Sequence, residues 1–76
     1  MNREEAIIMA AEALNTNVDE IKDNVKEVPE IGGFYFWQNI RGGNSVIIDS
    51  AGERLRATSA VSFERHLEAF KNGKRN

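Results

Sequence analysis

Four side chains in the second half of the chain have the chemistry to bind a planar or anionic partner: Tyr35, Trp37, Arg54 and Arg56. Residues two apart in a strand point to the same face, so each pair projects from one side of its strand. Aromatic rings interleaved with arginines can stack on bases and contact phosphates. Large aromatics in small domains also pack under helices or at dimer contacts. We take these four residues as the candidate binding surface, on one face of a sheet.

Catalytic and metal chemistry has little support in the sequence. His66 is the only histidine, and Ser62 precedes it by one helical turn. A nucleophile–base pair also needs an orienting carboxylate, for which Asp49 is the one candidate. The glycine pairs at 32–33 and 42–43 lack the lysine of a phosphate-binding loop and read as turns. We expect an ordinary half-buried helix histidine, no enzyme, no metal site and no cofactor.

The aromatic run that carries two of the candidate residues predicts the first strand of a sheet. Three strands are expected, at 34–40, 45–49 and 54–58, joined by glycine-containing turns at 41–44 and 50–52. Alternation assigns Phe34, Phe36 and Ile40 to the core. In the third strand it directs Leu55 and Ala57 inward.

Helices are expected at 3–14, 18–28 and 60–72. The polar residues 15–17 are weak helix formers and good caps, and Asn17 with Glu20 has capping-box spacing. Pro29 is a plausible stop for the second helix. An alternative remains open, because apolar residues between Ile7 and Val28 also follow a heptad seam that fits one long helix.

The segment from Met9 to Ile21 reads MAAEALNTNVDEI, an Ala-Glu-Ala-Leu run, a short polar turn and Val-Asp-Glu-Ile. It resembles the closing helices of phage-repressor-type helix-turn-helix domains. The resemblance covers thirteen of the 76 residues and implies two helices packed across a short turn. The segment is acidic and includes no counterpart of a recognition helix, so the resemblance does not imply DNA binding.

The last helix has clear end signals. Ser59 or Ser62 is expected to cap its beginning, and Gly73 its end. Its apolar stripe is Ala60, Phe63, Leu67 and Phe70. The residues 74–76 that follow are expected to fray.

Length and composition favour a small soluble domain. The chain has 76 residues, no cysteine and a net charge of −2. Small secreted domains usually carry disulfides, so we expect the cytoplasm. The apolar run near the N-terminus is too short to span a membrane. Residues 1–33 carry eight acidic and three basic side chains, and residues 34–76 carry four acidic and seven basic ones. A basic half of this kind can meet an anionic partner.

Together these patterns predict one α+β domain over residues 1–76 in the order α-α-β-β-β-α. A three-stranded antiparallel meander would carry helices on one face. The function expected is a non-catalytic protein-interaction or regulatory module of bacterial or phage type, which binds another protein or a second copy. The alternatives are a weak single-stranded nucleic-acid binder and an immunity-type inhibitor.

Overall fold

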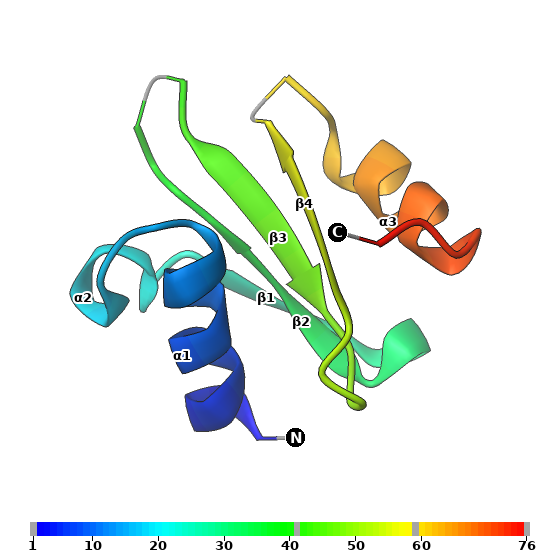
Figure 1. Cartoon of the computed structure of the whole chain (residues 1–76), viewed down its shortest axis with the longest axis horizontal. Coiled ribbons are helices and arrows are strands. Elements are labelled where there is room, and N and C mark those ends of the chain that lie inside the picture. Colours follow the sequence, from blue (N-terminus) through cyan, green and yellow to red (C-terminus); the bar gives the residue numbers. More distant parts are fainter. Residues whose placement is uncertain (1, 41, 59, 76) are drawn as a thin grey trace.

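The computed structural model describes residues 2–40, 42–58 and 60–75 (Figure 1). Their elements are α1 (Arg3–Ala13), α2 (Val18–Ile21), β1 (Val25–Val28), a 3-10 turn (Pro29–Ile31), β2 (Gly33–Trp37), β3 (Asn44–Ile48), β4 (Arg54–Thr58) and α3 (Phe63–Lys71). The four strands form one antiparallel sheet in the order β1-β2-β3-β4. The predicted α+β class is confirmed, whereas the predicted number of strands is one too low.

The extra strand lies where the sequence predicted the second half of a helix over 18–28. That helix ends at Ile21, and β1 then pairs with β2. A spacing of three residues places Val25 and Val28 on one side of a helix but on opposite faces of a strand. In β1, Val25 packs toward α1 and Val28 toward α3. As a strand, this segment therefore contributes one valine to each of the two cores, whereas a helix would direct both valines to the same side.

The helices cover both faces of the sheet, so the prediction of helices on one face is wrong. Figure 1 shows the sheet between α1 and α2 on one side and α3 on the other. The α1-side core consists of Ala6, Ala10, Ala11, Ala13, Leu14, Ile21, Phe36, Val46 and Ile48. The α3-side core consists of Val28, Ile47, Leu67 and Phe70. Two faces need cover because β3 is apolar on both sides.

The break between the first two helices is confirmed, and the single long helix is wrong. Asn15 adopts a left-handed φ of 53°, which an uninterrupted helix does not allow. The side-chain oxygen of Asn17 then accepts a hydrogen bond from the Glu20 N–H at 3.1 Å. The Glu20 carboxylate accepts a hydrogen bond from the Thr16 hydroxyl. These local bonds begin α2 at the position that the capping signal indicated.

The first hairpin is wider than predicted. Strand β2 ends at Trp37 and not at residue 40, and the side chain of Ile40 is 62 % exposed, so its assignment to the core is wrong. Phe36 is fully buried, which stabilises the fold by roughly 1.5–3 kcal/mol. Arg41 of the predicted turn lies outside the described residues. The second hairpin matches the prediction, because Gly52 takes a left-handed φ of 85°.

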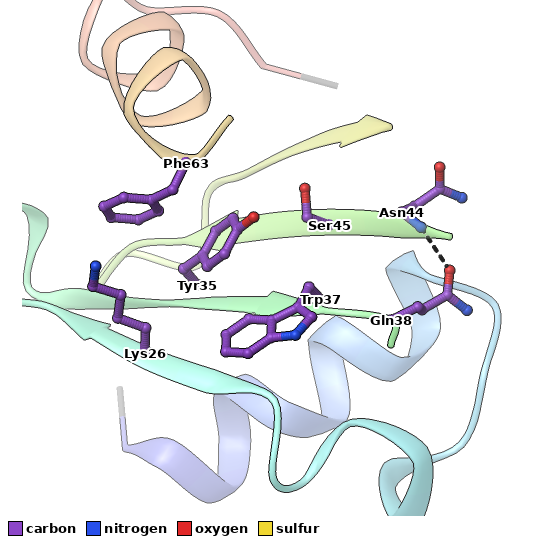
Figure 2. A pocket seen from close by; sticks show the side chains of 7 residues that line it. All are labelled: Lys26, Tyr35, Trp37, Gln38, Asn44, Ser45 and Phe63. Atoms are coloured by element: carbon purple, nitrogen blue, oxygen red, sulfur yellow. Dashed lines mark hydrogen bonds between the residues drawn. The ribbon is translucent and has the colours of Figure 1, made fainter. Parts of the chain in front are cut away.

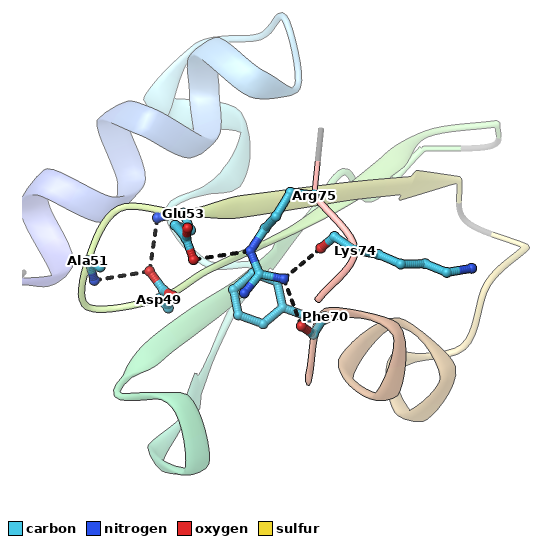
Figure 3. Close-up of polar contacts among 6 residues, drawn as sticks. All are labelled: Asp49, Ala51, Glu53, Phe70, Lys74 and Arg75. Atoms are coloured by element: carbon cyan, nitrogen blue, oxygen red, sulfur yellow. Dashed lines mark hydrogen bonds and ion pairs between the residues drawn. The ribbon is translucent and has the colours of Figure 1, made fainter. Parts of the chain in front are cut away.

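Lys74 and Arg75 are held by hydrogen bonds instead of frayed, whereas residue 76 of the predicted frayed tail lies outside the described residues. Ser62 caps α3 by accepting a hydrogen bond from the Arg65 N–H, whereas Ser59 lies outside the described residues. Gly73, with a φ of 95°, ends the helix as predicted. Arg75 then folds back: its guanidinium lies 3.7 Å from the centre of the Phe70 ring and donates a hydrogen bond to the Phe70 carbonyl at 2.7 Å (Figure 3). The same side chain pairs with the Glu53 carboxylate at 3.3 Å.

Candidate functional site

The structure does not bring the four predicted binding residues together. In the ladder between β3 and β4, Arg54 lies opposite Ile48 and Arg56 opposite Val46, on the α1 face. Tyr35 lies opposite Ile47, on the α3 face. The expectation that the aromatics and the arginines share one face is therefore wrong. Alternation shows which residues of one strand share a face, but it does not show which face of β2 matches which face of β4. That match depends on how both strands pair with β3.

On the α1 face, Arg56 lies beside the end of α1. The Arg56 guanidinium donates a hydrogen bond to the carbonyl of Ala13, at 3.0 Å, in the last turn of that helix. A cation at this end of a helix interacts favourably with the helix dipole. Arg56 thus links β4 to α1.

On the α3 face, Tyr35 and Trp37 lie beside a hollow of about 360 Å³. Helix α3 packs mainly on β3 and β4, and its Phe63 also contacts Tyr35 of β2. The Tyr35 and Trp37 side chains stay partly exposed beside it. The hollow is within the size range of ligand sites. Figure 2 shows its lining: Lys26, Tyr35, Trp37, Gln38, Asn44, Ser45 and Phe63. We call it the aromatic hollow.

Three rings shape the aromatic hollow. Tyr35 and Trp37 stack with ring centres 5.5 Å apart and planes inclined by 29°. Phe63, in the first turn of α3, meets the Tyr35 ring edge-on at 4.8 Å. Such offset and edge-to-face pairs favour fixed ring positions. The aromatic wall is therefore organised by contacts within the protein, while Tyr35, Trp37 and Phe63 stay partly exposed.

One cation among the described residues, Lys26, lies at the rim of the aromatic hollow. The ammonium nitrogen of Lys26 lies 4.3 Å from the centre of the Phe63 ring. Within residues 2–40, 42–58 and 60–75, ion pairs join Lys71 to Glu30 and Arg75 to Glu53, and none includes Lys26. Among these residues the Lys26 ammonium group therefore contacts an aromatic ring and no carboxylate.

The other end of the hollow is polar, and its Gln38 side chain forms hydrogen bonds with backbone groups. The Asn44 N–H donates a hydrogen bond to the Gln38 side-chain oxygen at 2.9 Å. The Gln38 amide nitrogen donates in turn to the Leu14 carbonyl at 3.4 Å. Gln38 therefore connects the loop end of the β2–β3 hairpin to the end of α1.

His66 lies behind the hollow and is fully buried instead of half-buried, and the serine it contacts is Ser45, not the neighbouring Ser62. Ser62 caps α3, whereas the His66 Nδ1 lies 3.1 Å from the Ser45 hydroxyl. The His66 Nε2 lies 2.6 Å from the Leu55 carbonyl, which can only accept, so Nε2 carries the hydrogen. In the neutral ring Nδ1 then accepts from Ser45. Burial lowers the pKa of His66 from its usual value of 6.5, and the bond to Leu55 opposes this only in part.

The serine–histidine pair is a buried structural contact in this arrangement. Ser45 is 2 % exposed and His66 1 % exposed, so the hydroxyl is largely closed to a substrate. The pair spans the gap between α3 and β3, where it satisfies two polar groups that would otherwise be costly to bury. Sequence reasoning missed it because Ser45 and His66 are 21 residues apart and no local pattern relates them.

Comparisons with known proteins add no relative. No family model, curated protein or solved structure matches the chain. In the part of the chain that the structure describes, acidic, histidine and cysteine side chains form no group suited to a metal ion. Over the same residues, none of the helices is both long enough and apolar enough to cross a bilayer.

Proposed function

We propose that the chain is a non-catalytic protein-interaction module and that the aromatic hollow is its binding site. The observation that carries the proposal is the stacked pair Tyr35 and Trp37, which stays partly exposed beside a cavity. Exposed aromatics at the edge of a cavity are the residue types that dominate binding energy at protein interfaces. The absence of cysteine in so small a domain supports a cytoplasmic location.

Single-stranded nucleic acid is a weaker candidate than the sequence suggested. Phosphate contacts dominate nucleic-acid affinity and require several cations along one surface. Arg54 and Arg56 lie on the α1 face, and among the described residues Lys26 is the only cation that lines the aromatic hollow. The net charge of −2 also opposes binding to a polyanion. An immunity-type inhibitor remains one form of the proposed module, in which the acidic first half of the chain meets a basic partner.

A selection from a random peptide display library tests the proposal directly. We expect peptides that bind the wild-type protein to lose about tenfold or more of their affinity for the Trp37→Ala variant. Ile8→Ala is the matched control, because Ile8 is an apolar side chain on α1 that is 57 % exposed and far from the hollow. This variant should bind as the wild type does. Circular dichroism of each variant establishes that the fold is retained.

Two results would overturn this assignment. One is a selection that enriches no peptide, or only peptides that bind Trp37→Ala as tightly as the wild type. The other is a homodimer, seen by sedimentation equilibrium, that Trp37→Ala converts to a monomer. A second copy would then occupy the hollow instead of a separate partner.

A further inference from the structure

We infer that the aromatic hollow selects an extended protein segment in which an aromatic residue and an acidic residue are two positions apart. This inference rests on the proposed function and specifies the chemistry of the partner. Three observations support it: the neutral aromatic wall of the hollow, the ammonium group of Lys26 at the rim, which forms no ion pair among the described residues, and the spacing between the wall and that group.

The acidic half of the motif follows from the charge of Lys26. Its ammonium group lies against the Phe63 ring and forms no ion pair among the described residues. A ring attracts a cation through its face but accepts none of the three N–H hydrogen bonds that an ammonium group donates. A partner carboxylate at the rim would accept such bonds in a site that the partner itself shields from water. Charge-assisted bonds of this kind are stronger than neutral ones.

The other charges near the hollow do not compete for this role. Glu27 follows Lys26 in β1 and therefore points to the α1 face. Glu64 is exposed on α3 and does not line the hollow. The described lining residues other than Lys26 are neutral, so Lys26 is the charge that a partner would meet among them.

The aromatic half of the motif follows from the wall. The rings of Tyr35, Trp37 and Phe63 offer apolar faces and edges, and the cavity of about 360 Å³ has room for a further ring. Three aromatics can also form a cage for a cationic ligand. Here Lys26 already lies against one of the rings, so a second cation would be repelled.

The spacing of the motif follows from the sheet register. Lys26 lies opposite Tyr35, which places Trp37 two residues further along β2, at the diagonal position. Diagonal neighbours on one face are separated by roughly 7–8 Å. In an extended peptide, residues i and i+2 project to the same side and lie about 6.7 Å apart. A peptide can thus place a ring near Trp37 and a carboxylate near Lys26 at the same time.

Three short peptides test the inference: the acetylated, amidated sequence Ser-Phe-Ser-Glu-Ser and its versions with Gln or Lys in place of Glu. Trp37 is the only tryptophan, so its fluorescence reports binding, and backbone amide NMR titration locates the contact. We expect the Glu peptide to bind about three- to tenfold more tightly than the Gln peptide, and the Lys peptide to bind most weakly. Lys26→Gln should remove the difference between the Glu and Gln peptides.

The controls separate this inference from the proposed function. Lys22→Gln removes an exposed lysine that does not line the hollow and should leave the order of the peptides unchanged. Equal binding of the Glu and Gln peptides, or no binding at millimolar concentration, would refute the motif. The proposed function would then still be tested independently by the display selection. Tighter binding of the Lys peptide would instead identify a cation cage. Tighter binding of oligodeoxythymidylate than of any peptide would overturn both proposals.

Discussion

At the scale of single residues, His66 joins the aromatic hollow to the α3-side core. Its ring donates to the Leu55 carbonyl, accepts from Ser45, and meets the Tyr35 ring edge-on with centres 5.7 Å apart. Tyr35 and Ser45 line the hollow, so one buried imidazole supports two of its lining residues. A charged imidazolium would lose the bond from Ser45 as it is formed here and would be poorly solvated.

Acid should therefore destabilise the fold through His66. Its lowered pKa means that the unfolded chain, with a histidine pKa near 6.5, binds the proton more strongly. The stability from neutral His66 is complete above about pH 6.5 and declines as the pH falls toward the lowered pKa. The slope cannot exceed about 1.4 kcal/mol per pH unit for one group. Urea unfolding between pH 7.5 and 5.5 measures it.

His66→Gln provides the control, because the chain has one histidine and glutamine keeps an amide for hydrogen bonding. The variant should be less stable at pH 7.5 but nearly independent of pH down to 5.5. A wild-type protein equally stable at both ends of this range would contradict the prediction.

At the scale of elements, the sequence predicted what local chemistry determines. Helix α1, the cap at Asn17, the hairpin at Gly52 and the end of α3 at Gly73 each depend on bonds between near neighbours in the chain. Strand β1 does not. Residues 25–28 are compatible with a helix until β2 offers its free edge, and pairing with that edge then overrides the weaker helical preference.

Gly33 provides an element-scale test of the pairing between β2 and β3. A Cβ atom at this position would lie 1.9 Å from the Ile48 carbonyl oxygen, at the start of β2 where β3 passes. We expect Gly33→Ala to destabilise the protein by at least about 3 kcal/mol, or to prevent folding, because backbone cannot give way as a side chain can. Gly42→Ala is the comparison, since among the described residues no atom beyond its chain neighbours lies within 4 Å of its Cβ position. Its left-handed φ of 76° should cost only about 1–2 kcal/mol.

Chemical denaturation of the two glycine variants gives the comparison directly. A loss for Gly33→Ala no larger than that for Gly42→Ala would show that β2 and β3 can separate locally without loss of the fold.

At the scale of the whole molecule, the sheet separates two small cores that must fold together. Neither core is large, and a domain of this size has a total stability of about 4–11 kcal/mol. The candidate site depends on this arrangement, which explains why sequence reasoning found only part of it. Tyr35 and Trp37 were recognisable by type, but Lys26, Ser45 and Phe63 become their neighbours only through the register of β1 to β3 and the docking of α3.

Single substitutions on either side should therefore shift one common unfolding transition. Leu14→Ala in the α1-side core and Leu67→Ala in the α3-side core should each cost about 2–5 kcal/mol. Far-ultraviolet circular dichroism and Trp37 fluorescence should give the same midpoint in each variant, although Trp37 and Leu14 lie on opposite faces. Ile8→Ala, on the exposed side of α1, should change stability by less than about 0.5 kcal/mol.

Separate midpoints for the two probes in Leu14→Ala would contradict the prediction. They would mean that the α3 side of the sheet persists after the α1 side has unfolded.

The stacking of Tyr35 on Trp37 has an optical consequence. The chain has one tyrosine and one tryptophan, and their ring centres are 5.5 Å apart. At this separation, light absorbed by the phenol is transferred to the indole before the phenol can emit. The folded protein should thus show almost pure tryptophan emission even when tyrosine is excited, and tyrosine emission should return when the rings separate. The ratio of the two emission bands is a built-in, label-free measure of whether the wall of the aromatic hollow is assembled.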